Sequence, residues 1–590
     1  MLLTDSEKGR LRLILSFTVT AYIALRAYKV HSGSAKLLLH GLLAVSVLLI
    51  LADLFVQFKN RNGAASSGPV PGEAPLSPAG LPGFLISALR IPGRHALLLL
   101  LINRFDRFFF CLYRDYGRGF VAVDRVLVDL ALAELLVLIV NRICAARGSR
   151  LAVFSGARED LRFLVTYRRY LHVVFYAAFA CVFCSRYLNT TMFRYILTDD
   201  HPVTQLTRTV FLVLLILGVF EAGQAESHLL CAVLTASLAI GFMAYRQGSG
   251  RHTILAMCIL IAAAAGKDMK KLLLIFVIEG LALTVAVHIC MRQGILLNLR
   301  MNRVMDDGLK TIRYALGSIS QTDYAAHLLF TVIAWCMIRP VRSRWWAYLD
   351  YPVMYFLYLI AAKLNHATAN ALLILTVIGA TLLHQLYVSS GFRPGKALQT
   401  AGRWIGGAAA SSFVVFFVLS NAFSLSYTEE KPLPLEGLTA LVPNFKSYIS
   451  RLRYANEALA SYPLSLFGTA VRESGNGGRL TRTKEYSFID ISYVRVLLVG
   501  GILFTILLIG ILTYIQIRNC MDRRYYRLFL MLIISVNCLV EHHIFEFHYI
   551  VFPLIAFMIC PGGQTLRHHA GDGAGGSEFI TEPGGHDGQF

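Results

Sequence analysis

The chain has 590 residues, of which 56% are hydrophobic and only 15% are charged, and its mean hydropathy is +0.58. A typical soluble domain carries about 25% charged residues, so the composition excludes an ordinary soluble protein and indicates a polytopic membrane protein. The net charge of +21 comes from Lys and Arg that cluster in short loops, where such residues set topology and contact anionic lipids. No nucleic-acid motif accompanies them, so membrane lipids are the expected partner and nucleic acid is not.

Sixteen apolar runs predict membrane spans, and several of them are shorter than the ~20 residues that a full span needs. We therefore expect an all-α fold with about 12–16 transmembrane helices. The runs cover residues 11–28, 36–58, 81–102, 121–141, 170–186, 206–222, 227–245, 252–266, 271–290, 325–338, 346–363, 368–389, 405–424, 493–516, 526–540 and 549–560.

Basic loops predict the orientation of these spans, because Lys and Arg are enriched on the cytoplasmic side. With a cytoplasmic N-terminus, five basic loops fall on the cytoplasmic side, and the C-terminus is cytoplasmic too. The loop 103–120 disagrees, since it carries four arginines and comes out external. The five concordant loops are 142–169, 267–271, 339–344, 393–403 and 518–527.

Composition also divides the chain into segments. A Gly/Pro/Ala-rich stretch is typical of a flexible linker. A polar, Gly-rich C-terminus is typical of a disordered cytoplasmic tail. One long polar stretch between two spans predicts a large external loop. The predicted order is 1–59 N-terminal membrane helices, 60–80 linker, 81–424 membrane helices, 425–492 external loop, 493–560 C-terminal membrane helices and 561–590 tail.

Eleven cysteines are scattered, mostly within apolar runs. Cys181 and Cys184 form a CxxC, but no second pair accompanies them. We interpret them as packing residues and not as metal ligands.

The external loop 425–492 contains a predicted amphipathic helix over 449–460, because Leu452, Ala455 and Leu459 recur at helical spacing. Arg451 and Arg453 lie in the same stretch but are two residues apart, so they cannot share a helix face and one of them is expected to be solvated. A large structured loop between helices commonly carries function.

The stretch 540–550, VEHHIFEFHYI, places ionisable residues between two apolar runs, where they are costly unless they serve a purpose. By the parity of the spans it lies on the same external side as the arginines of the loop. The candidate residues on this side are Arg313, Arg451, Arg453, Asp490, Tyr493, Glu541, His542, His543, Glu546 and His548.

This residue set suits a phosphate-bearing substrate that reacts at a hydroxyl group. Arg has a planar cationic fork that matches phosphate, and a histidine or carboxylate can accept a proton from a sugar hydroxyl. Plainer readings remain open: an arginine near a helix end often reaches for lipid headgroups, and His542 and Glu546 have the spacing of an i, i+4 pair. A metal site from Glu541, His543 and His548 is conceivable, but their spacing matches no standard zinc motif, so no metal is predicted.

Five segments in order resemble the Wzy-type polysaccharide polymerases of bacterial capsule and exopolysaccharide clusters, especially the Gram-positive type. The resemblance covers about residues 206–560, and within it Arg451 takes the place of the family's loop arginine. The segments are AAGKDMKKLLLIFVIEG (264–280), RYALGSISQTDYAAHLL (313–329), SRLRYANEALASYPLSLFGT (450–469), YSFIDISYVRVLLVGGILFTILL (486–508) and VEHHIFEFHYIVFPLIAFM (540–558).

The chain also departs from the family pattern. Where the family often has His-Pro-Asn, this chain has Gln321-Thr322-Asp323, and the final element has Ile550 or Val551 in place of an Asn. Near KLNHATANALLI (363–374) the family often shows Ser-Arg-Thr; here that arginine is missing, or Lys363 or His366 substitutes for it.

The resemblance implies a helical fold related to the O-antigen ligase and polymerase glycosyltransferases (GT-C-like). It implies an inverting, metal-independent and cofactor-free enzyme of the bacterial cytoplasmic membrane, which joins undecaprenyl-pyrophosphate-linked repeat units on the outer face. A lipid-linked donor and acceptor are then the substrates, and a flippase and a chain-length regulator of the same pathway are further expected partners.

The resemblance also gives the candidate residues roles. His543 or Glu541 would be the base or its orienter, Arg451 with Arg313 and Arg453 would hold the pyrophosphate, and Asp490 and Tyr493 would order the loop or contact sugar. Two alternatives stay open, a ligase that attaches glycan to another acceptor and a lipid-glycan flippase. A transporter is expected to show internal pseudo-symmetry, and no repeat is evident in this sequence.

Overall fold

The computed structural model describes the chain from residue 168 to residue 559, with gaps. The described ranges are 168–198, 201–223, 227–247, 251–304, 310–339, 348–390, 395–427, 445–475 and 486–559, together with residues 225 and 477. The first four predicted spans, the linker 60–80, the loop 103–120 and the tail 561–590 lie outside these ranges.

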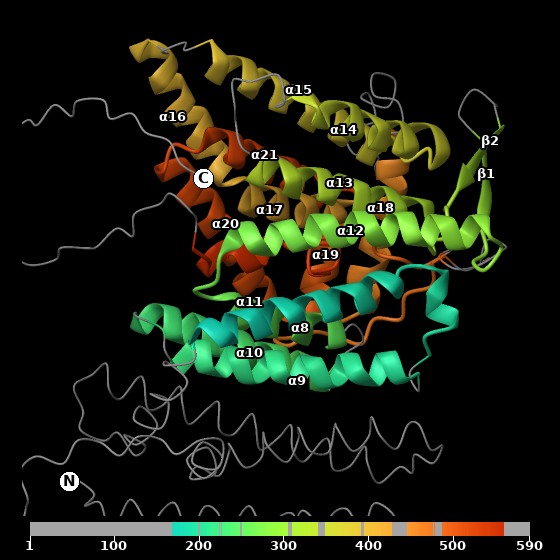
Figure 1. The fold of residues 1–590 in the computed structure, drawn as a ribbon, viewed down its shortest axis with the longest axis horizontal. Coiled ribbons are helices and arrows are strands. Elements are labelled where there is room, and N and C mark those ends of the chain that lie inside the picture. Colours follow the sequence, from blue (N-terminus) through green and yellow to red (C-terminus); the bar gives the residue numbers. More distant parts are fainter. Residues whose placement is uncertain are drawn as a thin grey trace, which may run out of the picture.

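The described part is a helix bundle, which confirms the predicted all-α class. In Figure 1, α8 to α11 form one side of the bundle, α14 to α16 the other, and the long α12 crosses between them with α13, α17 and α19 to α21. The elements are α8 (Arg168–Leu188), α9 (Pro202–Gly223), α10 (His228–Gln247), α11 (Arg251–Ala264), α12 (Met269–Arg292), α13 (Gln321–Ile338), α14 (Asp350–Leu359), η3 (Ile360–Leu364), α15 (Thr368–Ser389), α16 (Lys396–Ala410), α17 (Ser412–Ser426), α18 (Phe445–Ser461), α19 (Ser492–Arg495), η5 (Val496–Gly500), α20 (Gly501–Met521), α21 (Tyr525–Asn537) and η6 (Phe552–Phe557).

Four helices of the described part are long and apolar enough to cross a membrane, and a fifth span arises if the bent pair Gln399–Ala410 and Ser412–Ser426 counts as one. The chain is thus a multi-pass membrane protein, as predicted, while the count of 12–16 spans stays a prediction. The four helices are Tyr170–Leu188, Met269–Arg292, Thr368–Ser389 and Ser492–Met521.

The last predicted span, 549–560, is not a spanning helix. Over the described residues 549–559 only the short 3₁₀ helix η6 forms, with Pro553 in its first turn, and Gly266 N of the turn before α12 donates to Phe557 O at 2.9 Å. A proline cannot continue an interior helical hydrogen-bond ladder. An apolar run of this length is also compatible with a buried, non-spanning segment, which is what the structure shows.

A small antiparallel hairpin, β1 (Arg300–Val304) and β2 (Lys310–Tyr314), lies at one end of the bundle (Figure 1). It was not predicted, because its strands, RMNRV and KTIRY, lack a sustained apolar–polar alternation. The hairpin pairs Met301 with Arg313 and so places one of the candidate arginines on a strand.

Lys267 lies in a predicted basic turn, where contact with anionic lipids was expected, but its environment is different. Lys267 is fully buried and its ammonium group forms an ion pair with Glu221 of α9. The Lys267 Nζ atom also lies 5.9 Å from the centroid of the Phe175 ring. Paired in this way, the residue ties the α11–α12 turn to α9 and does not contact lipid headgroups.

The predicted amphipathic helix is confirmed as α18, with Leu452 and Ala455 buried. After α18 the chain packs against the π-helical turn η5, where Thr469 N donates to Leu498 O at 2.8 Å and Ile502 N donates to Ser465 O at 3.0 Å. A π-turn disturbs the regular helical ladder, and the returning loop supplies partners for its backbone groups.

Replacing Gly468 with alanine is expected to destabilise this junction strongly. Gly468 has a φ of +92°, and an added Cβ would lie 2.0 Å from Val499 O; the backbone conformation alone costs a non-glycine residue roughly 1–3 kcal/mol. Thermal unfolding in detergent measures the effect. Gly379→Ala is the matched control, because a Cβ there meets no atom within 4 Å, and an equal fall in Tm for both variants would contradict the prediction.

Candidate functional site

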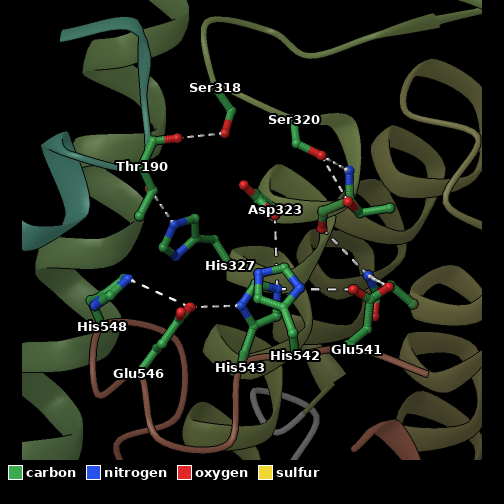
Figure 2. A network of polar contacts seen from close by, with 12 residues as sticks. Thr190, Ser318, Ser320, Asp323, His327, Glu541, His542, His543, Glu546 and His548 are labelled. Atoms are coloured by element: carbon green, nitrogen blue, oxygen red, sulfur yellow. Dashed lines mark hydrogen bonds and ion pairs between the residues drawn. The ribbon is translucent and has the colours of Figure 1, made fainter. Parts of the chain in front are cut away.

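The stretch VEHHIFEFHYI forms a series of tight turns after α21 and is enclosed by the bundle. Glu546 N donates to His543 O at 2.9 Å and Tyr549 N donates to Glu546 O at 2.8 Å. His543 is fully buried, and Glu541 and His548 are 3% and 8% exposed. Figure 2 shows their side chains pointing toward one another, so the ionisable residues form one buried network, here called the His543 cluster (Asp323, Glu541, His542, His543, Glu546 and His548).

One side of the His543 ring is held by a chain of charged groups. The Nδ1 atom of His543 lies 3.0 Å from Glu546 Oε2, and Arg495 of α19 binds Glu546 Oε1 at 2.8 Å. Arg495 also donates to both carboxylate oxygens of Glu473 in the loop 425–492, with Nε–Oε1 and Nη2–Oε2 distances of 3.0 Å. This loop is thereby connected to His543 through two carboxylates and one guanidinium.

These charges and burial give His542, His543 and His548 different pKa values. Burial lowers the pKa of His543, but the hydrogen bond and charge of Glu546, with Asp323 and Glu541, outweigh burial and raise the pKa. Burial lowers the pKa of His542 well below its usual value and that of His548 to about 3. Burial also favours a protonated Glu546, yet Arg495 and the histidines keep the pKa of Glu546 well below its usual value. His543 is therefore the strongest proton acceptor among the three.

The other side of the His543 ring faces two further carboxylates. Its Nε2 atom is buried and has no hydrogen-bond partner among the described residues. It lies 3.9 Å from both Asp323 Oδ1 and Glu541 Oε2, which is beyond hydrogen-bonding distance. One ligand atom from each of Asp323, His542 and His543 lies within 4.8 Å of the others, so this side has the donors of a possible metal site.

Stacked aromatic rings fix the position of the imidazole. His543 packs on Tyr549 with ring centroids 3.8 Å apart, and Tyr549 stacks on His327 of α13 at 4.1 Å. His327 in turn packs on Tyr187 at 4.1 Å, and its Nε2 lies 2.8 Å from Thr190 Oγ1. The column leaves the His543 ring little freedom to rotate.

Amide side chains and a serine hold the Glu541 end of the cluster. Asn537 donates to Asn370 Oδ1 at 2.9 Å, and Asn370 Nδ2 lies 3.5 Å from Glu541 Oε1. The Ser492 hydroxyl donates to the backbone oxygen of Glu541. Helices α15, α19 and α21 thus meet at this residue.

Arg451 and Asp490 lie beside the cluster, as the sequence predicted for residues of one site. Arg451 Nη1 donates to the backbone oxygen of Val540, and its Nε lies 3.7 Å from Asp490 Oδ2. Burial raises the pKa of Asp490 although Arg451 opposes the shift, and Tyr486 donates a hydrogen bond to Asp490 at 3.1 Å. Arg451 is therefore anchored where the loop 425–492 meets the VEHHIFEFHYI turn.

The remaining predicted residues lie elsewhere. Arg453 is on another face of α18, with its side chain 40% exposed and 3.7 Å from Glu457, as expected for one of two arginines that cannot share a face. Tyr493 is fully buried and donates to Ser535 O at 2.9 Å, so it fixes the start of α19 against α21 and does not point into the His543 cluster.

Arg313 forms a second cationic group, at the junction of η3 and α15. Its Nε donates to Asn365 O at 2.9 Å. His366 has a left-handed φ of 47° there. Burial lowers the pKa of His366, and the charges of Arg313 and Lys363 lower it further. His366, one of the two suggested substitutes for a missing arginine, thus lies close enough to Arg313 and to Lys363, the other, to feel both charges.

Sequence reasoning missed Arg495, Glu473, Asp323 and His327. Arg495 was hidden within a predicted span, although a charge inside a span is itself a signal of function or pairing. Asp323 was visible only as a departure from a family pattern, and Glu473 is one of many charged residues in the loop 425–492.

No family model, curated protein or solved structure matches the chain at a significant level. The resemblance to the Wzy-type polymerases is therefore a hypothesis that depends on its short motifs alone.

Proposed function

We propose that this chain is a membrane-embedded polymerase that joins undecaprenyl-pyrophosphate-linked oligosaccharide repeat units on the outer face of the bacterial cytoplasmic membrane. The observation that supports it best is His543, a buried imidazole with Nδ1 on Glu546 and with no hydrogen bond from the described residues to its Nε2. A carboxylate that holds one nitrogen leaves the other as a proton acceptor of fixed tautomer. An orphaned basic nitrogen deep in a membrane protein is costly, which is typical of a functional group.

In the proposed step, a sugar hydroxyl of the acceptor attacks the anomeric carbon of the growing chain from the face opposite the pyrophosphate. The new carbon–oxygen bond forms as the bond to the pyrophosphate oxygen breaks, and undecaprenyl pyrophosphate leaves with the electron pair. The hydroxyl proton passes to His543 Nε2, and Glu546 stabilises the resulting imidazolium. The anomeric configuration inverts, and the reaction needs neither a redox partner nor a metal.

The departing pyrophosphate requires fixed cations, because its charge is released in a site with few other donors. Arg451 is suited to this role, since its contact with Asp490 is long at 3.7 Å and its side chain is 18% exposed. A planar guanidinium can exchange such a carboxylate for a phosphate. Arg313 with Lys363 supplies a second group of positive charge for the other lipid-linked substrate.

Substrate entry requires the external loop to move, because His543 Nε2 is enclosed in this conformation. The loop is attached to the site through the ion pair of Glu473 with Arg495 and through the hydrogen bond from Arg451 to the backbone oxygen of Val540. Loop opening would break one or both contacts, and closing would re-form them around bound sugar while water is excluded.

The test is polymer formation by purified protein in detergent on a lipid-linked repeat unit, without added metal. We expect a ladder of products from the wild type and a loss of about 10²-fold in rate for Arg451→Ala, the usual effect of removing a donor to a developing charge. Arg453→Ala is the matched control and is expected to keep most of the activity, because Arg453 is paired with Glu457 on another face of α18.

Other outcomes would overturn the proposal. Transfer of the glycan to a different acceptor, without a ladder, would indicate a ligase. Movement of intact substrate across a vesicle membrane, without new glycosidic bonds, would indicate a flippase. Equal activity of Arg451→Ala and wild type would remove Arg451 from the site.

A further inference from the structure

We propose that Asp323, His542 and His543 bind a transition-metal ion of the Zn²⁺ class, with Glu541 beside His543 as a further carboxylate. Ligand atoms of the first three residues lie within 4.8 Å of one another. They come from α13 and from the turn after α21, two parts of the chain that are distant in sequence but face each other in Figure 2. The donors are two imidazoles and one carboxylate, with the Glu541 carboxylate 3.9 Å from His543 Nε2. This set suits zinc and similar ions better than Mg²⁺ or Ca²⁺, which prefer oxygen ligands.

The spacing of the donors fits an ion better than direct contact. His543 Nε2 lies 3.9 Å from Asp323 Oδ1 and 3.9 Å from Glu541 Oε2, too far for hydrogen bonds. Ligands at about 2.1 Å from a tetrahedral metal are roughly 3.4 Å apart. These two distances need to shorten by about half an ångström, and each separation among Asp323, His542 and His543 by at most about 1.4 Å, to reach the spacing of a tetrahedral site.

The histidine nitrogens provide independent evidence that points to a ligand. His543 Nε2 and His542 Nδ1 are both buried without hydrogen-bond partners among the described residues, and His543 as a whole is fully buried. Buried polar atoms are nearly always satisfied, so two neighbouring orphans need an explanation. A metal ion bound to both nitrogens satisfies them together.

The surroundings of His543 have the form that metal-binding histidines require. A ligating imidazole usually donates its other N–H to a carboxylate, which fixes the tautomer and strengthens the metal bond. Glu546 Oε2 lies 3.0 Å from His543 Nδ1, and Arg495 holds Glu546 in place. The two carboxylates Asp323 and Glu541 would neutralise the two charges of the ion, which favours its binding in a buried site.

Metal binding would also regulate the reaction, an inference that rests on the proposed function. The lone pair of His543 Nε2 cannot both bind an ion and accept a proton from the sugar hydroxyl. The metal-bound protein is therefore inactive, and removal of the ion restores the base.

Binding is tested first, with a readout that needs no activity. Protein is purified without a histidine tag and treated with a chelator. One sample is titrated with Co²⁺, and visible absorption reports coordination by nitrogen and oxygen. Another is loaded with Zn²⁺ and desalted, and elemental analysis counts the Zn²⁺ that it retains. The wild type is expected to bind one equivalent that His542→Ala and Asp323→Asn lose. Glu546→Gln is expected to weaken binding about 10–100-fold, as outer-shell changes do.

His384→Ala is the matched control and is expected to bind like the wild type, because His384 stacks on Tyr526 and is not among the proposed donors. Size-exclusion profiles and thermal unfolding show whether each variant is folded. If the wild type retains no more metal than folded His542→Ala, the site does not exist. If Asp323→Asn and His384→Ala behave alike, the donor set is wrong.

The regulatory part is tested on polymer formation with and without saturating Zn²⁺. If Zn²⁺ suppresses polymer formation by the control variant His384→Ala, whose proposed site is intact, and a chelator restores it, the result supports regulation by the metal. If the protein binds one equivalent of Zn²⁺ but still forms the same ladder of products, regulation is overturned and the metal site stands. A protein that binds metal but forms no ladder under any condition overturns the proposed function and not the metal site, so the two failures are distinguishable.

Discussion

Replacing His543 with glutamine is expected to lower the rate of polymer formation by about 10²- to 10⁴-fold, the range that a general base contributes. Glutamine is of similar length and can still contact Glu546, but its amide cannot accept the proton of a sugar hydroxyl at neutral pH. The initial rate of ladder growth at saturating substrate measures the effect, and binding of the lipid-linked donor reports whether the site keeps its shape.

His548→Gln provides the comparison within the same turn. His548 is buried, with a pKa lowered to about 3, and its Nε2 lies 4.0 Å from Glu546 Oε2. We expect this variant to retain activity within a few-fold, because His548 is not the proposed proton acceptor. A severe loss of activity in His548→Gln, combined with near-normal activity in His543→Gln, would show that His543 is not the base.

Replacing Arg495 with methionine is expected to destabilise the protein by about 3–5 kcal/mol, as removal of one partner from a buried ion pair does. The side chain of Arg495 is 11% exposed and binds Glu473 and Glu546 at once, so its loss leaves two carboxylates without their cation. It also packs against Phe545 and Phe488, with distances of 5.0 and 5.4 Å to the ring centroids. Thermal unfolding in detergent measures the loss as a lower Tm.

Two variants decide whether unpaired charge is the cause. Adding Glu473→Gln to Arg495→Met removes one uncompensated carboxylate and is expected to recover part of the Tm. Arg453→Ala breaks a pair that is 40% and 58% exposed and is expected to change stability by no more than about 1 kcal/mol. If Arg453→Ala lowers Tm as much as Arg495→Met, burial of the pair is not what makes Arg495 important.

Position along the chain explains which site residues the sequence could reveal. The VEHHIFEFHYI stretch was visible because its charges interrupt apolar sequence. Arg451 was visible because it lies in a helix with a clear apolar spacing. Asp490 was predicted for the same site and lies 3.7 Å from Arg451. By contrast, Arg495 lies inside an apolar run, and its partner Glu473 is separated from it by 21 intervening residues, so no local pattern joins them.

The sequence by itself determined that this is a multi-pass helical membrane protein with an amphipathic helix in its long polar loop, because hydropathy and helical periodicity depend on neighbouring residues. Only the tertiary structure decided that Asp323, Glu473 and Arg495 meet around His543, that Tyr493 and Lys267 pack inside the bundle, and that 549–560 folds as a short buried turn. These outcomes depend on contacts between residues far apart in the chain, where burial and pairing of charge outweigh local preference.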